Sequence, residues 1–160
     1  MTAAAQAARP LAESEVCLTR VFDAPRELVF RTWTEPRHLA QWWGPRGFTN
    51  PVCELELRVG GRILIHMRAP DGTVYPMTGT FREIMPPERL VFSAIVEDVA
   101  GRALLEGLVT VTFEEQSGKT KITVREKAVA LVAVAGPMLD GMEKGWAQSL
   151  NRLDALVAKA

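Results

Sequence analysis

Apolar and polar residues alternate through most of the middle of the chain, from Phe48 to Arg125, with turn residues between the alternating runs. Every second residue is apolar from Cys53 to Val59, and a similar run follows at residues 63–67, after Gly60-Gly61. A period of two is typical of half-buried strands. The pattern therefore predicts an antiparallel sheet in this part of the chain.

One turn fixes the register of two neighbouring strands. Ala69-Pro70-Asp71-Gly72 fits a type I turn followed by a left-handed glycine, as in a three-residue hairpin loop. This register pairs Met67 with Tyr75, Ile65 with Met77, and Ile63 with Gly79. Directly paired residues share a face, so these side chains should point to the core and His66 away from it.

Strands and short helices are also predicted outside this hairpin. The alternation predicts further strands at residues 15–23, 80–85, 90–96, 103–114 and 119–127. Pro25 fits the first turn of a helix, and Glu35-Pro36 restarts a second one. The second helix should end at Trp43, because Gly44-Pro45 supplies a left-handed residue and then a helix-breaking proline.

The C-terminal part of the chain has a helical period. The uncharged segment 128–136 is expected to cross from the last strand to a helix that begins at Gly136-Pro137. An apolar stripe with spacings of three and four residues follows: Met142, Trp146, Ser149, Leu150, Leu153 and Val157. Glu143, Lys144, Arg152 and Lys159 are expected to face solvent.

These patterns predict an α+β fold in which an antiparallel sheet wraps around one long C-terminal helix. Two short helices between the first and second strands close one end. Residues 1–14 carry no periodic apolar face and are predicted to be a disordered tail, with residues 15–160 forming a single domain.

The balance of basic and acidic residues bears on which kinds of molecule the protein could bind. The 160 residues contain 19 Lys and Arg and 19 Asp and Glu, so the chain lacks the basic excess of a nucleic-acid-binding domain. No apolar run approaches about 18 residues, which argues against a membrane span. Cys17 and Cys53 form neither a CxxC pair nor a disulfide framework, so a cytoplasmic location is expected.

Large apolar side chains are the strongest candidates for a binding site. The expected cavity lining, between the sheet and the final helix, is Trp33, Trp42, Trp43, Phe48, Met67, Tyr75, Met77, Phe92, Met142 and Trp146. A solid core made of the same residues is the alternative. Gly79 and Gly107 also fall on the inward face, where a glycine leaves room for a ligand or for close packing.

Polar residues that point inward are few. Strand parity sends Tyr75 and Glu126 towards the core. A buried Glu126 could act as a general acid or base, but a carboxylate at a strand end is more often solvated or paired with Arg or Lys, and that interpretation is favoured. His38 and His66 are the only histidines, and neither belongs to a set of metal ligands. No catalytic residues, metal site or cofactor are therefore predicted.

Several long runs resemble one known family. DAPRELVFRTWTEPRHLAQWWGPRGFTNP, LRVGGRILIHMRAPDGTVYPMTGTFREIMPPERLVF, VTVTFEEQSGKTKITV and GWAQSLNRL are similar to proteins related to the activator of Hsp90 ATPase, within the START-like or Bet v 1-like superfamily. The resemblance implies the helix-grip fold, with a seven-stranded sheet around the C-terminal helix and usually a cavity between them. Glu56, where aspartate is commoner, and the apolar segment 128–136 depart from the family pattern.

The expected function is the binding of a hydrophobic or aromatic small molecule in this cavity. A protein-interaction module of the chaperone-cofactor kind is one alternative, and an exposed apolar patch would favour it. A cyclase-like or hydrolase-like enzyme is another, and it requires a titratable group with a shifted pKa inside the cavity. The sequence leaves the ligand, any reaction and the oligomeric state open, a homodimer included.

Overall fold

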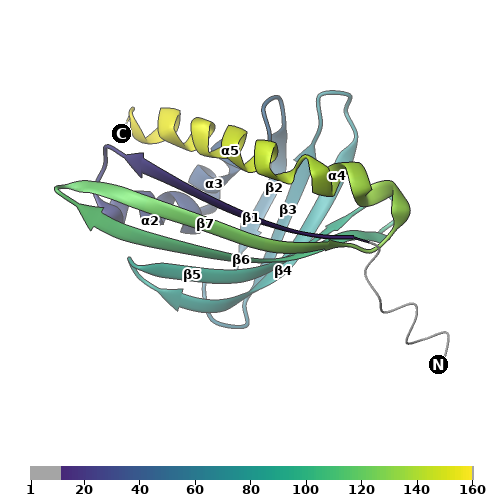
Figure 1. Ribbon diagram of the computed structural model, residues 1–160, viewed down its shortest axis with the longest axis horizontal. Coiled ribbons are helices and arrows are strands. Elements are labelled where there is room, and N and C mark those ends of the chain that lie inside the picture. Colours follow the sequence, from purple (N-terminus) through teal and green to yellow (C-terminus); the bar gives the residue numbers. More distant parts are fainter. Residues whose placement is uncertain (1–11, 160) are drawn as a thin grey trace.

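A single seven-stranded antiparallel sheet curls around a C-terminal helix in the computed structural model, which describes residues 12–159 (Figure 1). The strands are β1 (Ala12–Phe22), β2 (Thr49–Leu55), β3 (Arg62–Arg68), β4 (Val74–Met85), β5 (Arg89–Glu97), β6 (Ala103–Gln116) and β7 (Lys119–Ala130). Their order in the sheet is β1-β7-β6-β5-β4-β3-β2. The predicted α+β helix-grip fold is confirmed.

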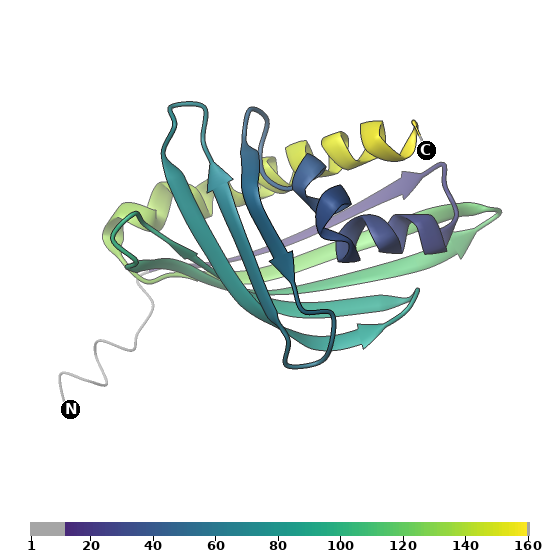
Figure 2. The ribbon, with the colours of Figure 1, turned by 180° about the vertical axis from the view of Figure 1, so that it is seen from behind.

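Five helical segments complete the described chain. They are α2 (Arg26–Thr34), α3 (Pro36–Trp42), the 3₁₀ turn η1 (Ala133–Ala135), α4 (Gly136–Asp140) and α5 (Met142–Val157). Figure 2 shows α2 and α3 beside the strands at one end, with α5 running behind them. Glu35 is extended between α2 and α3, as expected for a residue that precedes proline.

The hairpin register predicted from the turn at Ala69-Pro70-Asp71-Gly72 is confirmed. Met67 pairs with Tyr75, Ile65 with Met77, and Ile63 with Gly79. Gly72 has φ +90°, the left-handed conformation that this turn requires. His66 lies opposite Pro76, on the other face from these residues.

Four predictions about element limits and orientation need correction. β1 begins at Ala12, so residues 12–14 belong to a strand, and the rest of the predicted tail, residues 1–11, lies outside the described residues. β2 ends at Leu55, and the next apolar residues, Leu57 and Val59, are exposed. The predicted C-terminal helix is split at Gly141 into α4 and α5. The guanidinium of Arg152 donates hydrogen bonds to backbone carbonyls instead of facing solvent.

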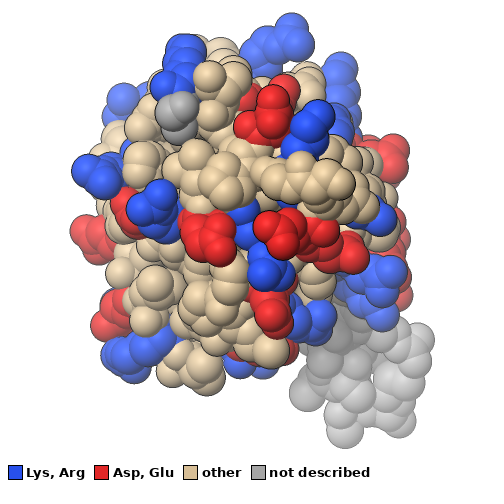
Figure 3. Space-filling model, turned by 90° about the vertical axis from the view of Figure 1, so that its left-hand side faces the viewer, with Lys and Arg blue, Asp and Glu red and all other residues tan. Residues whose placement is uncertain are grey.

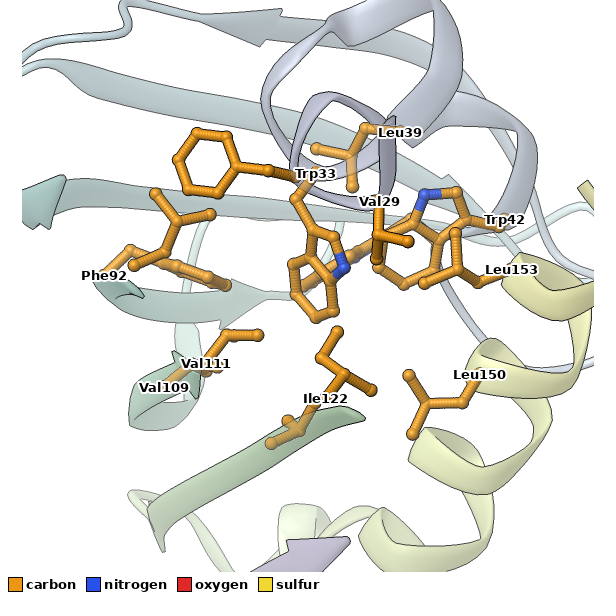
Figure 4. Close-up of a cluster of buried hydrophobic side chains, with 14 of the residues drawn as sticks. Val29, Trp33, Leu39, Trp42, Phe92, Val109, Val111, Ile122, Leu150 and Leu153 are labelled. Carbon is orange, nitrogen blue, oxygen red and sulfur yellow. The ribbon is translucent and has the colours of Figure 1, made fainter. Parts of the chain in front are cut away.

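The core lies between the concave face of the sheet and α2, α3 and α5. Trp33 occupies its centre, with Val109 and Ile122 of the sheet and Leu150 of α5 around it (Figure 4). Leu150 and Leu153 are fully buried, and each contributes about 1.5–3 kcal/mol through removal from water.

A second, smaller apolar cluster lies at the other end of the sheet. It contains Leu104, Ala128, Ala130, Ala135 and Leu139, so it joins β6 and β7 to η1 and α4. The uncharged segment 128–136 therefore supplies the end of β7 and the turn that buries this cluster.

Candidate binding cavity

A cavity of about 370 Å³ separates the central core from the smaller cluster. Its walls come from β3 to β7, from α4 and the first turns of α5, and from the segment after α3. The lining residues are Trp43, Gly44, Pro45, Phe48, Met67, Tyr75, Met77, Ala94, Val96, Leu105, Gly107, Val109, Glu126, Ala128, Met138, Gly141, Met142, Gly145, Trp146 and Ser149. The volume is within the range of small-molecule sites.

A row of small residues across three strands leaves this space open. Ala94 of β5 pairs with Gly107 of β6, which in turn pairs with Ala128 of β7. Phe92 and Val109 occupy the next inward row, where larger side chains fill the core. Inward residues of paired strands lie side by side, so three small residues in a row leave unfilled space between the sheet and α5.

The structure brings together most of the predicted lining. Trp43, Phe48, Met67, Tyr75, Met77, Met142 and Trp146 all border the cavity. Trp33 and Phe92 border a separate void of about 10 Å³ instead, which is too small for a ligand. Trp42 is fully buried, and its Nε1 donates to the carbonyl oxygen of Thr32 at 2.9 Å.

The two inward glycines have different surroundings. Gly107 lines the cavity, and a Cβ at this position would meet the carboxylate of Glu126. A Cβ at Gly79 would instead collide with the backbone carbonyl of Ser93, so Gly79 permits close approach of β4 to β5. Only Gly107 therefore contributes space to the site.

Glu126 is the one acidic residue in the lining, and the interpretation favoured from sequence was wrong for it. Its Oε1 accepts a hydrogen bond from Nε1 of Trp146 at 2.8 Å. Burial raises the pKa of this carboxyl above its ordinary value, and the Trp146 bond opposes that shift without cancelling it. Arg125 and Lys127, its neighbours on β7, pair with Glu15 of β1.

The tryptophan rings form a continuous cluster beside the cavity. Trp33 stacks on Trp146 with ring centroids 6.0 Å apart, and Trp43 meets Trp146 edge to face at 5.4 Å. These contacts fix the orientation of the Trp146 indole, and with it the donor that holds Glu126.

The rim of the cavity is tied to α5 by one arginine. Nη1 of Arg152 donates to the carbonyl oxygens of Trp43, Gly44 and Pro45 at 3.0–3.1 Å. Its Nη2 donates to the carbonyl oxygen of Gln41 at 3.0 Å. The last carbonyls of a helix have no hydrogen-bond donor within the helix. Arg152 supplies donors to these carbonyls at the end of α3. Sequence periodicity placed this residue outward because position 152 is not part of the apolar stripe, and periodicity carries no information about contacts with another element.

Metal-ligand clusters, long apolar helices and surface charge bear on other kinds of site within residues 12–159. No three side chains among His, Cys, Asp and Glu are grouped so as to hold a metal ion. None of the described helices is both long and apolar enough to cross a membrane. Lys and Arg are interspersed with Asp and Glu on the face shown in Figure 3.

A curled antiparallel sheet that holds a C-terminal helix over an internal cavity defines a helix-grip protein of the START-like or Bet v 1-like class. Residues 23–158 match the family described as activator of Hsp90 ATPase homolog 1-like protein. The chain belongs to this family.

Solved structures of bacterial proteins share the whole fold. A protein from Rhizobium leguminosarum is 25% identical, with a TM-score of 0.79 over 93% of this chain and 97% of its own. An AHSA1 protein from Silicibacter pomeroyi is 26% identical, with a TM-score of 0.75 over 91% of this chain and 98% of its own. A protein from Mycobacterium smegmatis is 28% identical, with a TM-score of 0.74 over 89% and 90%. No curated protein matches the chain.

Proposed function

We propose that the protein binds a hydrophobic or aromatic small molecule in the cavity between the sheet and α5. The observation that carries the proposal is the cavity itself, whose volume is about 370 Å³ and whose wall contains Trp43, Trp146 and several methionines. Aromatic and thioether side chains adapt to the shape of apolar ligands. The two free cysteines support a site of action in a reducing compartment.

The position of the exposed apolar residues favours the cavity over an interaction surface. The large exposed hydrophobic residues are spread over several elements and turns: Val21, Leu57, Val59, Met85, Val99, Leu108, Leu131 and Val134. Single exposed apolar residues are ordinary on soluble domains. The cavity, in contrast, gathers apolar residues from distant parts of the chain at one place.

Ligand titrations followed by tryptophan emission and thermal unfolding test the proposal. Trp43 and Trp146 border the cavity, so a bound aromatic molecule should change emission saturably. The same ligand should raise the melting temperature, since binding only the folded state stabilises it by about 2.7 kcal/mol at a hundredfold excess over Kd. Uncharged naphthalene derivatives are suitable probes, because the lining holds no cationic side chain within residues 12–159.

A cavity-filling variant and a matched control locate the binding. Ala94→Leu places a larger side chain on the cavity floor and should weaken binding by about tenfold or more, since the ligand loses apolar contact area. Ala155→Leu makes the same change at an exposed position of α5 and should leave affinity unchanged. Equal binding by both variants, or no saturable binding by any probe, would contradict the proposal.

A further inference from the structure

Glu126 places one carboxyl group in the wall of an apolar cavity, and it has no basic partner among residues 12–159. One oxygen, Oε1, is occupied by the bond from Trp146. The other, Oε2, lies where a side chain at position 107 would begin, so the glycine there makes room for it. Within residues 12–159 Oε2 makes no hydrogen bond, and it lies beside Gly107, which lines the cavity together with Glu126.

The remaining lining provides nothing to neutralise an anion. Glu126 and Tyr75 are the titratable side chains that border the cavity within residues 12–159, and neither carries positive charge. A ligand carboxylate or phosphate would lose its hydration and meet no cation. Anionic amphiphiles are therefore poor candidates for this site.

We propose that the ligand is an uncharged apolar molecule with a carbonyl group, and that Glu126 holds this carbonyl as a hydrogen-bond donor through Oε2. This inference rests on the proposed binding function and adds the polar chemistry of the ligand. Because Oε1 accepts from Trp146, a proton on Glu126 belongs on Oε2, beside the cavity-lining Gly107, where a ligand acceptor can reach it. A ligand acceptor satisfies that donor, whereas a hydrocarbon leaves it unpaired.

The electrostatics of the surroundings support the neutral acid. Burial favours the uncharged form of Glu126 and raises its pKa. A carboxylic acid held neutral in an apolar site can donate a hydrogen bond to a carbonyl at neutral pH.

Among the residues that the structure describes, no other charged side chain lines the cavity around Glu126. Inward neighbours from β1, β6 and α5 are uncharged: Val16, Gly107, Val109, Met142, Trp146 and Ser149. Glu143 and Lys144 of α5 are exposed outside the lining.

Four probes that share one ring system test the inference. Methyl naphthyl ketone, ethylnaphthalene, naphthylethylamine and naphthoate differ only in the group offered to Glu126. Titration calorimetry near pH 4.5, below the raised pKa of Glu126, should show the ketone binding about tenfold more tightly than the hydrocarbon, which corresponds to one net hydrogen bond. Naphthoate should bind most weakly.

The pH dependence identifies the donor. The preference for the ketone over the hydrocarbon should fall as pH rises through the pKa of Glu126, because the ionised carboxylate can only accept. Glu126→Gln keeps an acceptor for Trp146 and an amide donor, so it should prefer the ketone at every pH. Glu143→Gln, at an exposed position, should behave like the wild type.

A second variant tests the placement of Oε2. Gly107→Ala would displace the far end of the Glu126 side chain, so it should abolish the ketone preference while ethylnaphthalene still binds. Tightest binding by the amine, equal binding of ketone and hydrocarbon, or a pH-independent preference in the wild type would overturn the carbonyl assignment but not the cavity function. Failure of all four probes to bind would overturn the function itself.

Discussion

At the scale of single residues, Glu126 links the chemistry of the cavity to the stability of the fold. Its pKa in the folded state is raised by burial above the ordinary value of 4.5. Well below pH 4.5 the carboxyl is protonated in both the folded and unfolded states. As pH rises further, the unfolded chain releases this proton first, so the free energy of unfolding falls until the folded-state pKa has been passed.

Glu126→Gln should therefore be more stable than the wild type at neutral pH and equally stable near pH 4. The difference in the free energy of unfolding should grow as pH rises and then level off above the folded-state pKa of Glu126. Urea unfolding at a series of pH values measures this difference. A constant offset between the two proteins, or a larger wild-type stability at high pH, would show that the carboxyl is not desolvated.

The two cysteines should differ in reactivity. Burial, with a smaller contribution from Glu54, raises the pKa of the Cys53 thiol to about 11, whereas Cys17 is exposed. Because the thiolate is the reactive form, a disulfide reagent at pH 8 should modify Cys17 at least about tenfold faster than Cys53. Cys17→Ser should remove the fast phase and leave the slow one, and two equal rates would contradict the expected burial.

Strand parity predicted which face Glu126 occupies but not its partner. Parity depends on local spacing alone, and it correctly sent Glu126 inward. Its hydrogen-bond donor is Trp146, which is 20 residues away in sequence and stacks on Trp33. Contacts of this kind arise from packing between elements, so periodicity does not encode them.

At the scale of elements, Arg152 joins the end of α3 to the middle of α5. Arg152→Ala would leave the carbonyls of Gln41, Trp43, Gly44 and Pro45 without this donor. We expect a loss of about 1.5–3 kcal/mol in the free energy of unfolding, the range for hydrogen bonds to a charged group. The rim of the cavity should loosen as well, which would weaken ligand binding.

Arg37→Ala is the matched control for this variant, measured by the same chemical denaturation. Arg37 is exposed, and within residues 12–159 its side chain pairs with Glu35 alone, so its removal should cost less than about 0.5 kcal/mol. Comparable losses in both variants would mean that the guanidinium of Arg152 does not anchor α3.

Element type was easier to predict than element ends. Alternation and turn residues predicted the strand regions and the hairpin register, because each signal lies within a short window. They gave residues 80–85 as a further strand, whereas these residues continue β4, and the count of seven strands came from the family resemblance. Leu57 and Val59 continue the alternation beyond β2, but they lie in the connection that turns at Gly60-Gly61 and not in a strand. The break at Gly141 was hidden because the apolar period resumes at once in α5.

At the scale of the whole molecule, the cavity divides the apolar interior into two clusters of unequal size. The smaller cluster holds β6 and β7 to η1 and α4 mainly through alanines and two leucines. Segments with little buried apolar area open at lower free energy than a large core. The α4 end should therefore be the less stable part of the fold.

Native-state hydrogen exchange should reveal this difference. Amide protons near the smaller cluster, such as that of Leu131 bonded to the carbonyl of Leu104, should exchange at least about tenfold faster than those at Val111 and Phe113. A saturating cavity ligand should slow exchange on both sides. Uniform protection throughout β6, with or without ligand, would show that the two clusters open as one unit.

The fold could be predicted from sequence far more completely than the cavity. Local patterns and the resemblance to a known family determined the sheet and the gripping helix. The open space depends instead on Ala94, Gly107 and Ala128, which lie in three separate strands and become neighbours only through the register of β5, β6 and β7. Gly107 could be recognised in the sequence as a glycine on the inward face of a strand. Ala94 and Ala128 could not, because alanine is common on either face.

The crowded tryptophans also have an optical consequence. All four tryptophans of the chain lie in one cluster, and the rings of Trp33 and Trp42 are 4.6 Å apart with planes inclined by 63°. Neighbouring chromophores at an oblique angle couple their electronic transitions, so the far-ultraviolet circular dichroism should contain an exciton couplet in addition to the backbone signal. Trp42→Phe removes the tryptophan pair with the 4.6 Å separation and should weaken the couplet without removing helix, leaving the coupling among Trp33, Trp43 and Trp146, and an unchanged spectrum would contradict this geometry. Helix content estimated from the uncorrected spectrum would therefore be in error.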